Sequence, residues 1–169
     1  MSSDRVDAMA LVDLAARMGF GHAVEYREAA TLPETMLTFF LIDGRVPDAT
    51  KHQLLRSIRS SSAPLRKYAP IICVLANGPR HRAVPLVEMG FDDVLFLVDP
   101  VGAMSSQIAA QLHHELVYVQ TAHYFGPDRR RIELIDRADP RRKPGAASGI
   151  RKFKVVRDPA RGVEVSPAS

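Results

Sequence analysis

Asp43 is the side chain whose position in this sequence most favours chemistry. It follows the apolar run 37–42, which has the length of a buried strand, and Gly44 comes next. In open α/β sheets, ligands and reacting groups gather at the carboxyl ends of the strands, so a carboxylate here can serve a ligand or a reaction. Alternatively, Asp43 is a turn residue whose carboxylate accepts hydrogen bonds from nearby backbone amides.

A second group of candidate residues follows the predicted helices. It consists of two aromatic residues, a Gly-Pro pair and a run of arginines: Tyr124, Phe125, Arg129, Arg130 and Arg131. Arginine binds phosphate or carboxylate groups through two parallel hydrogen bonds, so this segment can bind an anionic partner. Alternatively, the aromatic side chains pack against the preceding domain, and the arginines are solvated or paired with acidic residues nearby.

The elements that position these residues alternate along the chain. Apolar periodicity predicts helices over residues 5–18, 28–36, 48–60, 80–89 and 101–121, and strands over residues 22–26, 37–42, 70–76 and 94–98. This alternation predicts a parallel sheet with helices on both faces. We expect one domain over residues 1–123. Residues 124–169 are expected to form a basic, largely extended or disordered tail with a short strand at 153–156.

Composition limits the classes of protein to be considered. The chain has 169 residues and 46% hydrophobic content, which suits one domain with an appendage. Residues 127–169 hold 12 Lys and Arg against 6 Asp and Glu, so the net charge of +4 comes from this segment. The single Cys73 lies in an apolar run and is expected to be buried in a reducing compartment. Without a long apolar run or a signal peptide, we expect a cytoplasmic protein with no membrane insertion.

Several segments, in order, resemble the receiver domain of bacterial response regulators. In residues 42–48, Pro47 follows Asp43 by four positions, as it follows the phosphoacceptor of that family. Residues 70–76 resemble the fourth strand of the family, residues 88–93 the segment before its fifth strand, and residues 18–25 the end of its first helix and its second strand. The resemblance covers about residues 4–118. It implies a flavodoxin-like open sheet of four strands if the first strand of the family is absent here, or of five if the true start lies upstream of Met1 and restores that strand.

The resemblance also identifies what this chain lacks. Where the family carries an acidic pair for Mg²⁺, a switch hydroxyl and a lysine, this chain has Ser2 and Ser3, Leu75, and Asp99. A Mg²⁺ ion would have only Asp4 and Asp43 as ligands. We expect the negative charge of Asp99 to repel a phosphoryl group on Asp43.

These features predict a stand-alone, receiver-like signalling protein that is not an enzyme. It would act by protein contact, with weak or no phosphorylation of Asp43, and Mg²⁺ would be needed only for that phosphorylation. The expected partner is a histidine kinase, a phosphotransferase or an output protein. A second copy is an alternative partner, with apolar contacts from Val101, Met104, Leu116 and Val117. The other hypothesis is a nucleic-acid-binding regulator that uses the basic tail, although the tail lacks a helix-turn-helix pattern.

Overall fold

The computed structural model describes residues 3–26, 28, 32–33, 35–128 and 149–168, and these residues form two sheets. The parallel sheet has the order β1-β2-β3, with β1 (Phe40–Asp43), β2 (Ile71–Leu75) and β3 (Asp93–Phe96). The antiparallel sheet has the order β5-β4-β6-β7, with β4 (Leu116–Gln120), β5 (Phe125–Pro127), β6 (Arg151–Asp158) and β7 (Gly162–Pro167). The predicted α/β class is confirmed, but in the described chain the parallel sheet has three strands instead of four or five.

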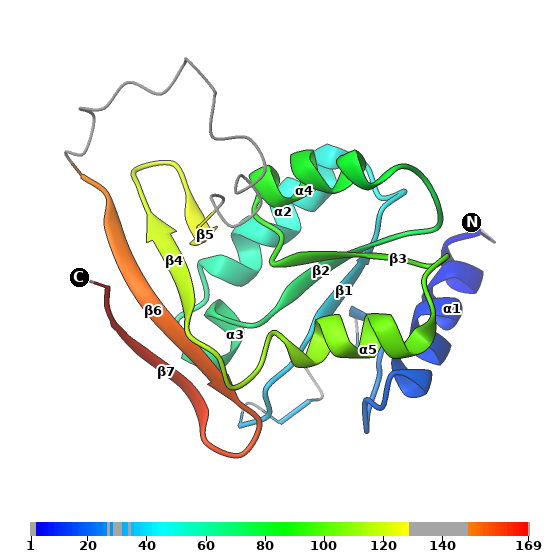
Figure 1. Ribbon diagram of the computed structural model, residues 1–169, viewed down its shortest axis with the longest axis horizontal. Helices are drawn as coiled ribbons and strands as arrows, with labels where there is room; N and C mark the ends of the chain where they lie inside the picture. The colour runs from blue at the N-terminus through cyan, green and yellow to red at the C-terminus, as the bar shows by residue number, and fades with distance from the viewer. Residues whose placement is uncertain (1–2, 27, 29–31, 34, 129–148, 169) are drawn as a thin grey trace.

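Helices cover both faces of the parallel sheet (Figure 1). One face packs against α2 (Asp48–Arg59) and α4 (Ala83–Met89), and the other against α1 (Ser3–Arg17) and α5 (Val101–Ala109). Two short helices, α3 (Pro64–Lys67) and η2 (Arg80–Arg82), precede β2 and α4. Within the described ranges, none of the helices has the length and apolar character needed to cross a membrane.

Burial on both faces explains why β2 is a continuous apolar run. Ile71, Cys73 and Leu75 join the core beneath α2 and α4, and Ile72 and Val74 join the core beneath α1 and α5. Cys73 has no exposed surface, as its apolar surroundings in the sequence predict. Each large apolar side chain buried in this way contributes about 1.5–3 kcal/mol, so the two cores stabilise the sheet from both sides.

The antiparallel sheet forms a third core, on the side of the molecule away from the carboxyl ends of the parallel strands (left in Figure 1). Its buried members are Tyr68, which follows α3, Leu116 and Tyr118 on β4, and Val155 on β6. Leu116 and Tyr118 lie two residues apart and therefore face the same side of β4. This inward face, rather than a helical stripe, accounts for the apolar pattern over these residues.

The predicted helix over residues 101–121 is wrong beyond Ala109, where α5 ends. Leu116, which we placed on the helical stripe, belongs to β4. Between the two elements His113 has a φ of 59°, a left-handed conformation that few residues other than glycine adopt. Its backbone N–H donates to the carbonyl of Arg157 at 2.9 Å, which fixes the turn onto the second sheet.

The expected strand over residues 22–26 is not formed, because residues 22–25 have no regular structure. In the expected helix over residues 28–36, residue 28 lies in a short 3-10 segment, residues 32, 35 and 36 lie in bends and a turn, and residue 33 has no regular structure; the other positions lie outside the described residues. The apolar residues of these two segments suggested a strand and a helix, but their described residues form neither a strand nor an α-helix. No second strand therefore flanks β1 among the residues that the structure describes.

The described parts of the expected tail are paired strands. The strand predicted over 153–156 forms the middle of β6, which pairs with β4 so that Phe153 lies opposite Tyr118. The boundary that we expected at residue 124 falls between β4 and β5, two strands of one sheet. Residues 129–148, whose polar and small residues suggested a tail, lie outside the described residues.

Candidate functional site

Asp43 is the last residue of β1, and its carboxylate binds the arginine two residues later. Arg45 donates to it from Nη2 at 2.7 Å, from Nε at 3.1 and 3.3 Å, and from its backbone N–H at 2.7 Å. Hydrogen bonds from the Arg45 side chain hold the pKa of Asp43 below its ordinary value, against the opposing effect of partial burial. The carboxylate is therefore ionised at neutral pH, with Arg45 as its counterion.

The turn after Asp43 leaves no room for a side chain at Gly44. A Cβ atom there would lie 2.3 Å from Cδ2 of Leu75 and 3.1 Å from the carbonyl oxygen of Val74. Pro47 stands at the N-cap of α2, and the backbone N–H of Lys51 donates to its carbonyl oxygen at 3.0 Å. Leu75, where the resemblance to receivers led us to expect a switch hydroxyl, is thus an apolar side chain packed over the turn.

A buried lysine lies on the other side of the same turn. Nζ of Lys51 donates to the carbonyl of Gly44 at 2.7 Å and to the carboxylate of Asp48 at 3.1 Å. Its charge lowers the pKa of Asp43 slightly, after the larger effect of Arg45. Asp43 therefore lies in a positive local field supplied by residues of its own loop and of α2.

A small cavity of about 60 Å³ opens beside Asp43. It lies between α1, with Leu11 and Leu14, and the ends of the strands, with Val74 and Leu97. Arg45 and Asp43 supply its polar wall, and Asp43 is the one carboxylate among the described residues that line it. The lining of the cavity is mainly apolar and therefore does not supply the oxygen ligands that Mg²⁺ requires.

Of the two Mg²⁺ ligands expected from the sequence, the structure describes the side chain of one, Asp43. Asp4 lies in the first turn of α1, and its side chain is outside the described part of the chain. Across the described ranges, no three His, Cys, Asp or Glu side chains lie close enough to hold a metal ion. Asp43 is the described member of the pair, and its nearest ionic partner is Arg45.

Asp99, at the same edge of the parallel sheet, also has an arginine partner. Arg80 donates to its two carboxylate oxygens at 2.8 and 2.5 Å. The same guanidinium lies 4.6 Å from the centre of the Phe96 ring. Hydrogen bonds from Arg80 lower the pKa of Asp99. The repulsion that we expected from Asp99 is therefore offset, because its charge is neutralised within its own pair.

Tyr124 and Phe125 pack against the rest of the protein. The hydroxyl of Tyr124 donates to the carbonyl of Pro127 at 2.7 Å. Phe125 contacts the rings of Tyr68 and Tyr118, with ring centres 5.6 and 5.9 Å apart, and Nζ of Lys67 lies 4.7 Å from its centre. The three arginines predicted to bind anions, Arg129, Arg130 and Arg131, lie outside the described residues.

The surface suggested for a second copy is not available as we expected. Met104 and Leu116 are 2% and 7% exposed, because they belong to the cores beneath α5 and β4. Val101 and Val117 are half-buried and lie on different elements, α5 and β4. These four residues therefore do not form an apolar contact surface.

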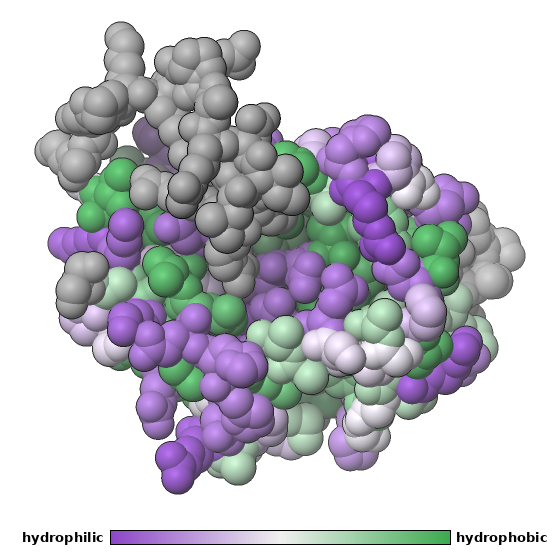
Figure 2. All heavy atoms as spheres, in the orientation of Figure 1, coloured by the Kyte–Doolittle hydropathy of each residue, from purple (hydrophilic) through white to green (hydrophobic). Residues whose placement is uncertain are grey.

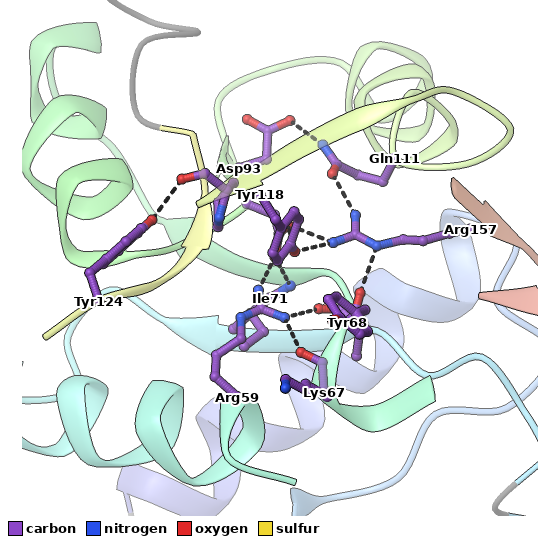
Figure 3. Close-up of polar contacts among 12 residues, drawn as sticks. Arg59, Lys67, Tyr68, Ile71, Asp93, Gln111, Tyr118, Tyr124 and Arg157 are labelled. Atoms are coloured by element: carbon purple, nitrogen blue, oxygen red, sulfur yellow. Dashed lines mark hydrogen bonds and ion pairs between the residues drawn. The ribbon is translucent and has the colours of Figure 1, made fainter. Parts of the chain in front are cut away.

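A buried polar cluster surrounds Asp92, just before β3, and no sequence motif indicated it (Figure 3). Oδ2 of Asp92 accepts from Nη2 of Arg59 at 2.5 Å and from the backbone N–H of Ile71 at 2.8 Å. Oδ1 accepts from Nη2 of Arg157 at 2.7 Å and from the Tyr118 hydroxyl at 2.5 Å. Figure 3 shows the two arginines approaching Tyr118 from different sides.

Two opposing effects set the charge of this cluster. Burial by itself would raise the pKa of Asp92, but Arg157 and Arg59 outweigh it, and the pKa falls to about 2. Burial raises the pKa of the Tyr118 hydroxyl, so the phenol stays neutral and donates. All four side chains are at most 6% exposed, so a solvent-borne ligand has no access to them. We interpret the cluster as the polar junction between the two sheets.

No model of a known protein family matches the chain, and a search of curated proteins finds no match. Its function must therefore be argued from the carboxyl edge of the parallel sheet, the end at which Asp43 and Asp99 lie.

Proposed function

We propose that this protein is a receiver-like signalling module that acts by contact with another protein and does not depend on phosphorylation of Asp43. The receiver-like part of the proposal comes from the order of the sequence segments. Its support in the fold is coarser: a parallel sheet with α1 and α5 on one face and α2 and α4 on the other.

The observation that carries the proposal is the ion pair between Asp43 and Arg45. A carboxylate that is to receive a phosphoryl group needs an exposed oxygen and a cation that neutralises the incoming charge. Here both oxygens of Asp43 already accept hydrogen bonds from Arg45. The position that the resemblance assigns to the switch hydroxyl holds Leu75, whose side chain has no hydrogen-bond donor.

Asp43 in its present setting is better suited to fixing the loop than to reacting. Its bonds to Arg45 and the lack of space at Gly44 hold the turn between β1 and α2 in one conformation. A rigid edge of this kind provides a constant surface for a partner, which is what a contact module requires.

Intact mass after incubation with a small-molecule phosphodonor and Mg²⁺ tests the proposal. We expect no gain of a phosphoryl group in the wild type or in the Asp43→Asn variant. The Arg45→Ala variant, in which Asp43 is uncovered, measures how much the arginine protects the carboxylate. A single phosphoryl group on the wild type that is lost in Asp43→Asn would overturn the proposal, whereas a group retained there would lie elsewhere.

Nucleic-acid binding by the C-terminal segment is the second candidate, and charge is its support. Among the described residues of this segment, Arg151 and Lys152 are exposed, but Lys154 pairs with Glu115 at 2.8 Å and Arg157 is buried against Asp92. Fluorescence anisotropy with a labelled single-stranded oligonucleotide at low salt tests this candidate. Binding should weaken steeply as salt rises, and Arg151→Ala with Lys152→Ala should reduce it.

A further inference from the structure

Apolar side chains are exposed at the carboxyl edge, beside the cavity. Leu97 lines the cavity and is 44% exposed, and Val98, which follows it, is 67% exposed. In the space-filling view, hydrophobic surface lies beside strongly hydrophilic surface where β3 leads into α5 (Figure 2). A scattered exposed apolar residue needs no explanation, but two in sequence at the mouth of an apolar cavity indicate a contact site.

The charged groups around these apolar residues present their positive members to solvent. The Arg45 side chain is 64% exposed over Asp43, which is 21% exposed. Arg80 is 66% exposed over Asp99, which is 14% exposed. Arg82, at the other end of η2 from Arg80, is exposed as well. At each of the two ion pairs, a partner therefore meets the guanidinium group first and the carboxylate behind it, whereas the nearby Asp48 exposes its carboxylate.

The size of the cavity restricts what can enter it. Pockets for small molecules and cofactors enclose about 300–1,000 Å³, several times more than the roughly 60 Å³ found here. This space accommodates one small aliphatic group, such as the end of a Leu, Ile or Val side chain. The natural occupant is thus a side chain of another protein, held by an apolar anchor.

We propose that the carboxyl edge binds an acidic, amphipathic segment of a partner protein. Its apolar side chain enters the cavity against Leu97, and its Asp or Glu residues pair with Arg45 and Arg80. Guanidinium groups bind carboxylates through two parallel hydrogen bonds, so they can fix the register of such a segment. This inference rests on the proposed function, for which it names the site and the chemistry of the partner.

Nucleic acid fits the same edge less well. A phosphate backbone needs a surplus of cations, but Arg45 and Arg80 each stand over a carboxylate. The carboxylate of Asp48, also at this edge, is 75% exposed, so an anionic partner must place its charges at the two arginines and away from Asp48, which a short peptide can do more readily than a continuous phosphate backbone. Among the described residues of this edge, bases would find no exposed aromatic ring, because Phe96 is buried beneath Arg80.

Selection from a random 16-residue peptide display library against the wild-type protein tests the inference. We expect the recovered peptides to combine Asp or Glu with Leu, Ile, Val, Met or Phe. A synthetic copy of the most enriched peptide, labelled with fluorescein, should bind at least tenfold more weakly to Leu97→Asp and to Arg80→Ala. Val165→Asp, which alters an exposed apolar residue of β7, is the matched control and should bind as the wild type does. Thermal unfolding of each variant checks that it is folded.

Three results would overturn the inference: no enrichment, enrichment of basic or uncharged peptides, or binding that is insensitive to both Leu97→Asp and Arg80→Ala. A labelled oligonucleotide that binds in an Arg80-dependent manner would assign this edge to nucleic acid and also overturn it. Peptides that bind another surface would overturn the inference about this edge but would leave the proposed function, contact with another protein, intact. Phosphorylation of Asp43 is read separately by mass, so the two failures can be told apart.

Discussion

Nη2 of Arg157 donates a hydrogen bond to Oδ1 of Asp92 at 2.7 Å, across 65 positions of sequence. Arg157 lies on β6 of the antiparallel sheet, and Asp92 immediately precedes β3 of the parallel sheet. The same guanidinium also donates from Nε to the carbonyl of Tyr68 at 2.7 Å and from Nη1 to Oε1 of Gln111 at 3.1 Å. One buried side chain thus connects four segments, so the second sheet is part of the folding unit that carries Asp43.

Replacing Arg157 with methionine should destabilise the protein by about 3 kcal/mol. The change leaves buried acceptors at Tyr68 and Gln111 without their donor and removes one of the two cations that hold Asp92. Urea unfolding followed by circular dichroism measures the loss. Arg161→Met, in the exposed turn between β6 and β7, is the matched control and should change stability by less than about 0.5 kcal/mol. Equal effects of the two changes would contradict the role given to Arg157.

Acid should weaken the same junction. The pKa of Asp92 is about 2 in the folded protein, below its ordinary value of 3.8, so its contribution to stability is fully present above about pH 4. It is lost as the pH falls from about 4 towards 2, because protonation removes the charge that holds two buried arginines. The urea midpoint, measured from pH 7 down to pH 2.5, should therefore decrease mainly below about pH 4. In Asp92→Asn, which is less stable at pH 7, the fall should be shallower; an equal fall would assign it to other carboxylates.

The parallel sheet could be predicted because its strands are short apolar runs that end at clear signals. Asp43-Gly44 ends β1, and Gly90, with a φ of 123°, ends α4 before β3 begins. Tertiary contacts decided the rest. Leu116 fits both a helical stripe and an alternating strand, and its pairing with Val155 on β6, which lies far along the chain, selects the strand.

In the candidate site, too, local features could be predicted from the sequence, whereas tertiary contacts could not. The place of Asp43 at a strand end follows from local hydrophobicity, and its pairing with Arg45 involves residues two positions apart, which a search for Asx turns could have found. The buried cluster could not be found in this way. Asp92 looks like one of two acidic residues in a turn, and its partner Arg59 like a polar helix end; only the fold makes them neighbours.

Replacing Arg45 with alanine should raise the pKa of Asp43 towards its ordinary value. The hydrogen bonds from Arg45 are the largest cause of the lowered pKa, and their loss leaves the opposing effect of burial in place. The pKa can be read from the pH dependence of the Asp43 carboxyl carbon shift in NMR spectra. Arg56→Ala, on α2, is the control and should leave that titration unchanged. If the pKa of Asp43 stays low in Arg45→Ala, another cation holds the carboxylate, and the argument against phosphorylation loses its basis.

Replacing Gly44 with alanine should destabilise the protein by about 1–3 kcal/mol, the usual effect of overpacking. The new Cβ would overlap Cδ2 of Leu75, a buried side chain with little room to move, and would press on the carbonyl of Val74. Gly102→Ala is the matched control, because a Cβ there meets no atom within 4 Å. In the double variant Gly44→Ala with Leu75→Ala, the loss of unfolding free energy should be smaller than the sum of the losses in the two single variants. Simple additivity in urea unfolding would mean that the two residues do not interact.

Cys73 provides a measurement of whether the two sheets unfold together. It is buried at the centre of β2, and burial raises its pKa to about 11, so the native thiol is both inaccessible and protonated at pH 8. A disulfide reagent should therefore label it only in molecules that have opened, at a rate set by the free energy of opening. If Arg157 joins the sheets into one unit, Arg157→Met should lower the free energy of opening obtained from labelling by the same amount as it lowers stability in urea. If Cys73 keeps its wild-type protection in this variant while the urea midpoint falls, the antiparallel sheet detaches alone, and the buried cluster does not couple it to the sheet that carries Asp43.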